Sequence, residues 1–263
     1  MPMDARLHLS LPYRMLDEQG DFFLARRLQP EVAFKGPDLD EADLDAVLER
    51  WSGAFRAAGL AVTVHAPFMD LNPGALEPLV RQVTALRLNQ ALDAAQRLGA
   101  RRLVVHPGYD RWRYGGNEDL WVEQSLEFWP ALIRRAAEAG VVLAMENVFE
   151  DVPDNLEKLL AALASPWFGH CFDVGHWHLF CRRRISLADW FERLGKHLVH
   201  LHVHDNLGEG DDHLPIGEGL IGFDEFFALV ARHAPQATLT LEAHEAHSLS
   251  RALLAVRPYL TGG

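Results

Sequence analysis

Two cysteines stand among the 263 residues, and no apolar run reaches the length of a membrane span. Cys171 and Cys181 lack Cys-x-x-Cys spacing, which excludes a disulfide framework and predicts two free buried thiols in a reducing cytoplasm. A bilayer-spanning helix needs roughly 20 consecutive apolar residues. Because residues 1–4 are short and polar, we expect neither a membrane anchor nor a signal peptide.

Basic side chains are also fewer than acidic ones. The chain has 25 Lys and Arg against 37 Asp and Glu, for a formal net charge of −12. This balance disfavours tight binding to a nucleic-acid backbone, which needs a basic patch, so DNA is a less favoured partner than a small molecule. In contrast, histidine is abundant, with 14 residues, and the hydrophobic fraction of 49% is typical of a globular protein.

Short apolar runs alternate with longer segments of helical periodicity along the chain. Eight runs are predicted to be strands: Arg6–Pro12, Pro30–Phe34, Leu60–Ala66, Arg101–His106, Val141–Glu146, His170–Asp173, Leu198–Asp205 and Ala237–Ala243. Helices are predicted between most of them, at Leu79–Leu98, Leu120–Ala139, Leu156–Leu163 and Phe223–His233. Eight β-then-α repeats without a linker predict one (β/α)8 TIM-barrel domain over residues 1–263, with an open doubly wound sheet as the alternative.

Ionisable side chains occupy the last position or two of six predicted strands. Alternate strand residues share a face, so the run at 198–205 places His200, His202 and His204 on the same side. The residues at the six strand ends are His65, His106, Glu146, Asp173, His202 and Glu242. Because barrel active sites lie at the carboxyl ends of the strands, these side chains are predicted to converge.

Their convergence indicates a divalent metal site. A single residue of this kind has an ordinary structural explanation, as for a hydrogen-bonded His106 before Pro107. Several carboxylates buried together would instead be forced to take up protons unless a cation joins them. His170, His204 and His244 lie near the same end and are candidates for partners that orient the ligands.

The motifs at these positions resemble those of the xylose isomerase-like TIM-barrel superfamily. It includes endonuclease IV (AP endonuclease family 2) and many sugar isomerases and epimerases. From about Pro30 onwards, the matching segments are Val64-His-Ala-Pro-Phe68, His106-Pro-Gly108, Glu146-Asn147, Phe172-Asp-Val-Gly-His176, His202-Val-His-Asp-Asn206, Asp211-Asp-His-Leu-Pro-Ile-Gly-Glu-Gly219 and Leu241-Glu242.

The resemblance to endonuclease IV implies three groups of zinc ligands. They are His65, His106 and Glu146; then Glu146, Asp173, His202 and Glu242; then His176, Asp211 and His213. Imidazole and carboxylate ligands suit zinc or manganese, so one to three such ions per chain are predicted. Asp212 is an alternative to Asp211, but the spacing to His213 favours Asp211. Such a site would belong to a three-metal phosphoester hydrolase acting on abasic DNA or a smaller phosphodiester.

The sugar isomerases and epimerases resemble only the second group, with one metal. In that interpretation, which we favour, Glu146 and Glu242 transfer protons and His176 hydrogen-bonds an oxygen of a sugar or sugar phosphate. Two positions depart from the relatives. Ketose 3-epimerases of this group usually carry an arginine where this chain has Gly208. The loop at 34–41 has one lysine and three acids, where endonuclease IV inserts an arginine into DNA. A non-catalytic metal-binding barrel is a third hypothesis.

Four further side chains are candidates for substrate contact. Phe68 is part of a pair with Met69 that matches residues endonuclease IV inserts into DNA, and alternatively forms an apolar wall. Arg111 and Arg113 lie in a loop that resembles a lid, where a guanidinium could meet a phosphate bidentately, or else in a solvated loop. Trp177 would line the pocket or fill the core. The run at 182–184, three arginines, is interpreted as solvated surface.

Overall fold

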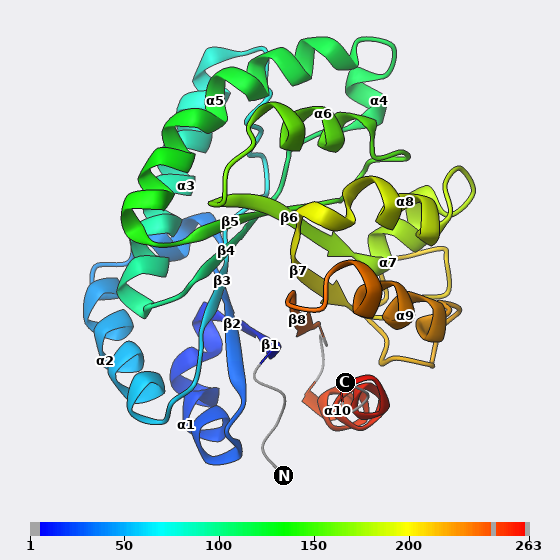
Figure 1. The fold of residues 1–263 in the computed structure, drawn as a ribbon. Coiled ribbons are helices and arrows are strands. Elements are labelled where there is room, and N and C mark those ends of the chain that lie inside the picture. The colour runs from blue at the N-terminus through cyan, green and yellow to red at the C-terminus, as the bar shows by residue number, and fades with distance from the viewer. Residues whose placement is uncertain (1–5, 243–245, 261–263) are drawn as a thin grey trace.

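The barrel is closed. In a computed structural model that describes residues 6–242 and 246–260, eight parallel strands follow one another in the order β1 to β8 (Figure 1). Pairing of Leu7 in β1 with Leu239 in β8 completes the ring. The strands are β1 Leu7–Pro12, β2 Gln29–Ala33, β3 Thr63–His65, β4 Arg102–Val105, β5 Val142–Glu146, β6 Phe168–Asp173, β7 Leu198–Val203 and β8 Thr238–Leu241. The predicted (β/α)8 barrel is confirmed, and the open sheet is wrong.

Helices surround the strands on the outside (Figure 1). They are α1 Leu16–Arg26, α2 Leu44–Ala57, α3 Pro78–Leu98, α4 Arg111–Tyr114, α5 Glu118–Ala139, α6 Asp154–Ala162, α7 Val174–His176, α8 Leu187–Leu194, α9 Phe223–His233 and α10 Ala246–Leu260. Short turns of other helix types are η1 Tyr13–Met15, η2 Gly36–Asp40, η3 Trp177–Cys181 and η4 Gly195–His197. In the described ranges, we find no helix long and apolar enough to cross a bilayer.

Several strands are shorter than the apolar runs that predicted them. The third begins only at Thr63, and His106 and Glu242 follow their strands directly rather than ending them. The extended path nevertheless continues past the last ladder pair, because the backbone N–H of Glu242 still donates to the carbonyl of Val203 at 3.3 Å. Ala243, the last residue of the eighth predicted strand, lies outside the described residues.

An aromatic cluster outside the barrel anchors the strand that ends in Asp173. The Phe172 ring lies 5.6 Å from Trp190 and 5.3 Å from Phe191, both of α8, and 6.1 Å from Phe226 of α9. All four side chains are buried. Because Phe172 points outwards, Asp173 points to the other face of β6, toward the barrel mouth.

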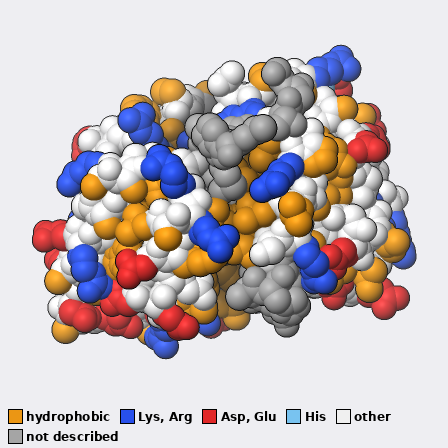
Figure 2. Space-filling view, turned by 90° about the horizontal axis from the view of Figure 1, so that it is seen from below, with side chains coloured by type: hydrophobic (Ala, Val, Ile, Leu, Met, Phe, Trp, Pro, Cys, Tyr) orange, Lys and Arg blue, Asp and Glu red, His pale blue; other side chains and the backbone are white. Residues whose placement is uncertain are grey.

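Charge on the outer surface is mixed. On the face drawn in Figure 2, basic and acidic side chains are interspersed among apolar ones. A nucleic-acid backbone would be attracted instead by a continuous basic surface. This face therefore offers no support for DNA as a partner.

Candidate metal centre

His202 of β7 lies where three carboxylates meet. Its Nδ1 atom is 3.4 Å from Oε2 of Glu146, 3.4 Å from Oε1 of Glu242 and 3.9 Å from Oδ2 of Asp173. Both ring nitrogens of His202 are buried, and neither makes a hydrogen bond of good geometry to any described residue. An imidazole nitrogen without a partner that faces three carboxylate oxygens fits a divalent cation. These are the four residues of the second predicted group.

The first predicted group also comes together. Oε2 of Glu146 lies 3.3 Å from Nε2 of His65 and 3.2 Å from Nε2 of His106. The other ring nitrogen of His65, Nδ1, lies 2.8 Å from the carbonyl of Ala66, which can accept its proton. That tautomer leaves Nε2 with a lone pair for a metal. Phe68 is 43% exposed and stacks on His106 at 4.3 Å, so it forms an apolar wall over this group.

The third predicted group converges at the outer side. Oδ2 of Asp211 lies 3.5 Å from Nε2 of His176 and 3.1 Å from Nε2 of His213. Nδ1 of His176 lies 3.2 Å from Oε1 of Glu146, which links this group to the other two. The neighbouring Asp212 instead accepts a hydrogen bond from the backbone of Leu207, so the geometry favours Asp211 as the spacing did.

His204 lies inside the third group, where the sequence predicted only an orienting partner. Its Nε2 atom is 3.3 Å from Oδ1 of Asp173 and 3.6 Å from Oδ1 of Asp211. Its ring stacks on His213 at 4.0 Å. Gly175 makes room for it, since a Cβ there would overlap the imidazole. Burial lowers the pKa of His204, but Asp173 and the other nearby carboxylates outweigh this and raise it to about 9.

Glu31 of β2 is a buried residue that the sequence analysis missed. Its Oε1 atom lies 2.9 Å from Nε2 of His202, and its Oε2 atom lies 2.9 Å from Nε2 of His200. Oε2 also accepts a hydrogen bond from Thr240. Burial opposes ionisation of Glu31, but His202 and His200 hold its pKa well below the usual value. An anionic Glu31 beside Nε2 of His202 would favour a proton on that nitrogen and so leave Nδ1 free to bind a metal.

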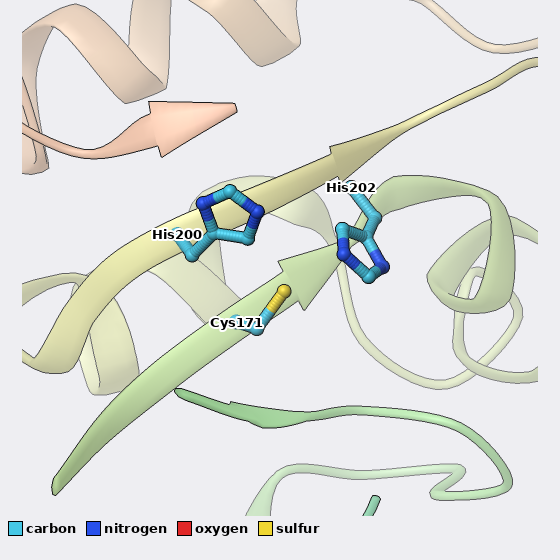
Figure 3. A group of neighbouring side chains, drawn as sticks. All are labelled: Cys171, His200 and His202. Carbon is cyan, nitrogen blue, oxygen red and sulfur yellow. The ribbon is translucent and has the colours of Figure 1, made fainter. Parts of the chain in front are cut away.

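Beneath His202, the barrel interior holds a layer of protein partners. Figure 3 shows Cys171 of β6 beside His200 and His202 of β7. Both ring nitrogens of His200 have hydrogen-bond partners, because Nδ1 lies 2.6 Å from the hydroxyl of Thr238 and Nε2 contacts Glu31. Burial raises the pKa of the Cys171 thiol, and a protonated thiol is a poor metal ligand. Cys171 and Cys181 are free and buried, as predicted.

Two histidines expected to orient ligands have other outcomes. His170 Nδ1 lies 2.8 Å from the carbonyl of Met145, and its Nε2 accepts from the indole of Trp190 at 3.2 Å. Both nitrogens therefore bind the protein framework, and the expectation for His170 is wrong. His244 lies outside the described residues.

Asp205 organises the loop that carries Asp211 and His213. Its carboxylate accepts hydrogen bonds from the backbone N–H groups of Gly217 at 3.0 Å, Gly219 at 2.8 Å and Ile221 at 3.1 Å. These bonds fold the end of the loop back onto β7. A buried carboxylate that accepts several backbone hydrogen bonds stabilises the loop. The position of Asp205 next to the ligand motif in the sequence gave no indication of this structural role.

The remaining candidates lie at the rim. Arg111 stacks its guanidinium over Trp112, 4.3 Å from the ring centroid, and Arg113 of the same helix is exposed. Trp177 follows His176 directly and is buried. Their roles toward a substrate stay predictions.

Together these residues fit a divalent metal by their donor chemistry. The predicted ligands offer imidazole nitrogens and carboxylate oxygens, the set that zinc and manganese take. Burial opposes the ionisation of Glu146, but His202 and His106 hold its pKa well below the usual value. The cluster thus combines ionised carboxylates with imidazoles at the carboxyl ends of the strands.

A closed parallel barrel with polar side chains gathered at its strand ends belongs to the class of TIM-barrel proteins with a functional site at that end. Within this class, the family model for the xylose isomerase-like TIM barrel matches residues 25–258, and the chain belongs to this family. The resemblance noted in the sequence from about Pro30 onwards is confirmed.

Sugar epimerases are among the relatives. The chain is 27% identical over 231 residues to L-ribulose-5-phosphate 3-epimerase UlaE of Salmonella paratyphi C, covering 80% of this chain and 78% of that protein. It is 28% identical over 207 residues to an uncharacterised protein of Methanocaldococcus jannaschii, covering 76% and 70%. The predicted sugar isomerase or epimerase is supported at this general level.

Solved structures share the fold. A D-tagatose 3-epimerase-like protein superimposes with a TM-score of 0.85 at 22% identity, over 97% of both chains. The TTHB071 protein of Thermus thermophilus, in crystals soaked with zinc chloride, superimposes with a TM-score of 0.82 at 29% identity, over 98% of this chain and 99% of that one.

Proposed function

We propose that the protein is a divalent-metal-dependent isomerase or epimerase of a sugar or sugar phosphate. One observation carries the proposal. The carboxylates of Glu146 and Glu242 lie at the same distance, 3.4 Å, from one atom, Nδ1 of His202. Two carboxylates that flank one position can work as an acid and a base on the two sides of a bound molecule.

Four residues would hold the metal: Glu146, Asp173, His202 and Glu242. A zinc or manganese ion bound there supplies Lewis acidity that polarises a carbonyl of the substrate. Glu31 would fix the ring of His202 from below. The stacked Phe68 and His106 would keep water from one side of the substrate.

The protein's own groups would move the proton. One of Glu146 and Glu242 removes a proton from the carbon next to the carbonyl, and the other returns one. Return on the opposite face gives an epimer. His176, whose Nδ1 lies 3.2 Å from Glu146, would donate a hydrogen bond to a substrate oxygen. Glu146 lies at the end of β5 and Glu242 just after β8, so the two carboxylates come from separate strands. This arrangement suits one carboxylate that removes the proton and another that returns it.

The test measures exchange of a carbon-bound proton of the substrate with solvent. Protein loaded with manganese or zinc is incubated in deuterated water with free and phosphorylated ketoses, and products are followed by NMR. We expect a new epimer or isomer with deuterium at the carbon whose proton was moved. Glu138→Gln, at an exposed position of α5, is the matched control and should retain the reaction. If metal-loaded protein exchanges no carbon-bound proton of any ketose, the proposal is wrong.

A second candidate is a three-metal phosphoester hydrolase similar to endonuclease IV. The observation that favours it is the third group, because Oδ2 of Asp211 lies within 3.5 Å of both His176 and His213. Two observations weigh against DNA as its substrate: the net charge of −12 and the acidic loop at 34–41. Metal content separates the candidates. About three zinc ions per chain, with cleavage of an abasic oligonucleotide or a small phosphodiester, would favour the hydrolase, and about one metal would favour the epimerase.

A further inference from the structure

A cavity of about 510 Å³ opens at the carboxyl-end face of the barrel, lined mainly by arginine and aromatic side chains. Its walls come from three loops that also carry the metal-site residues. Arg111 and Trp112 follow β4, Phe180 and Arg182 follow β6, and Gly208 follows β7. Gly208 stands three residues before Asp211 in the chain. The cavity is therefore built from the segments that continue out of the candidate metal centre.

Charge distinguishes this cavity. The chain has a net charge of −12, and several of its half-buried arginines are paired with acids, as Arg87 is with Asp40. In the part of the chain that the structure describes, Arg111 and Arg182 have no ion-pair partner, although both are half-buried. Two partly buried guanidinium groups that face one cavity repel each other, and a bound anion would remove that cost.

Arg182 is held in place by the protein backbone. Its Nη1 donates to the carbonyl of His178, one turn earlier in η3. Its Nη2 lies where a side chain at position 208 would begin, since a Cβ on Gly208 would be 2.6 Å from that nitrogen. The φ angle of Gly208, +82°, also favours glycine. A guanidinium has five N–H donors, so several remain for a ligand.

Arg111 is held by aromatic rings. Its guanidinium carbon lies 4.3 Å from the centroid of Trp112 and 5.8 Å from that of Phe180. Stacking on ring faces fixes the plane of the guanidinium while its N–H edges stay available. Such an edge matches two oxygens of a phosphate.

We propose that this cavity binds the phosphate group of a phosphorylated sugar, with Arg111 and Arg182 as its main contacts. The proposal rests on the proposed function, because it places the sugar carbons at the metal centre and the phosphate here. Arg182 follows the end of η3, the helical segment that begins directly after His176, so one short stretch of chain joins the candidate metal centre to this cavity. Arg183, on the same wall, adds positive charge.

The experiment compares two ligands that differ by the phosphate alone. Binding of L-ribulose 5-phosphate, free L-ribulose and inorganic phosphate to the metal-loaded protein is measured by calorimetry. We expect the phosphate ester to bind at least about tenfold more tightly than the free sugar, as for a charge-assisted contact. Arg182→Gln and Arg111→Gln should each reduce this preference about tenfold and leave free-sugar binding unchanged. Arg134→Gln, at an exposed position of α5, is the matched control.

The outcomes separate the cavity from the proposed function. Equal affinity for the two sugars in the wild type, or a preference that both cavity variants retain, overturns the proposal. If neither sugar binds, the binding of inorganic phosphate to the wild type and the variants tests the cavity on its own. Binding that Arg182→Gln and Arg111→Gln both weaken and Arg134→Gln retains supports the cavity even where the epimerase proposal has failed. Phosphate binding that does not depend on these arginines, or no phosphate binding, overturns it. Equal thermal unfolding of all variants shows that each is folded.

Discussion

The inner part of the candidate metal centre, which comprises the first and second groups of ligands, is built differently from the outer part, which is the third group. Inner residues such as Glu146 and His202 lie on strands, and their side chains are 2% and 0% exposed. Among the outer residues, Asp211 is 42% exposed and lies in the loop after β7, where His213 has a φ of +50°. The closed barrel sets the inner positions before any metal binds, whereas the outer positions depend on a loop. We therefore expect tight inner binding and weaker outer binding.

The largest expected effect comes from the residue that both parts share. Glu146 contacts His65, His106 and His202 through Oε2 and His176 through Oε1. Glu146→Gln should lower kcat on the order of 10³-fold, because it removes a proton-transferring group and a shared ligand. Metal content by mass spectrometry should fall in parallel.

Glu138→Gln is the control for this variant, since it removes a carboxylate that is exposed to water. Retention of more than a tenth of the activity by Glu146→Gln would show that the inner and outer parts do not depend on this residue.

Metal binding at the inner part can also be weakened through Glu31, which lies beneath His202. Glu31→Gln replaces the carboxylate that contacts Nε2 of His202 and should lower metal affinity by about 10- to 100-fold, the usual range for a residue that orients a ligand. The readout is competition with a fluorescent metal chelator. Glu31→Asp, which keeps the charge, should recover part of the affinity. Unchanged affinity in Glu31→Gln would mean that β7 alone orients His202.

The outer part offers a comparison between neighbours. Asp211→Asn removes an oxygen that lies 3.1 Å from His213, whereas Asp212→Asn changes a residue that only caps the same loop. In protein titrated with excess zinc, we expect Asp211→Asn to weaken binding at the outer part about tenfold or more and to spare the inner part. Calorimetric titration of metal-free protein with zinc would resolve the two. Equal effects of both substitutions would indicate that the loop, and not a ligand, was disturbed.

The strand-end residues were predictable because β-structure alternates faces with period two, so His65, Glu146, Asp173 and His202 could be placed from local pattern alone. Residues whose role depends on distant partners could not. Glu31 stands in a weak apolar run, and its partner His202 is 171 positions further along the chain.

The outer region shows the same limit. Arg182 belongs to a short basic run that was interpreted as solvated surface, whereas the structure places it in the lining of a cavity, against Gly208. His204 was placed on the correct face by the alternation, but its stacking on His213 depends on how the loop after β7 folds back. Loop geometry of this kind is set by contacts such as those of Asp205, which no local pattern encodes.

The loop after β5 is expected to affect stability rather than metal binding. Glu150 is buried, and burial raises its pKa from 4.5 to about 7. The folded chain then binds more protons than the unfolded chain between these two values, so this group lowers stability as the pH rises from about 4.5 to about 7. Glu150→Gln cannot ionise, and its amide oxygen can still accept from the backbone of Val148, as Oε2 does at 2.6 Å.

In metal-free protein, the free energy of unfolding of Glu150→Gln should therefore exceed that of the wild type by up to about 3 kcal/mol at pH 8, since each unit of pKa difference corresponds to about 1.4 kcal/mol. The excess should vanish below about pH 4.5, the ordinary pKa of this carboxyl, and urea denaturation over this range measures it. Glu138→Gln, exposed on α5, should show no such dependence. If the difference in free energy of unfolding between Glu150→Gln and the wild type does not change with pH, a partner in the loop compensates the charge of Glu150. Buried charge at this end of the barrel would then be compensated in the loop after β5 as well as at the strand ends.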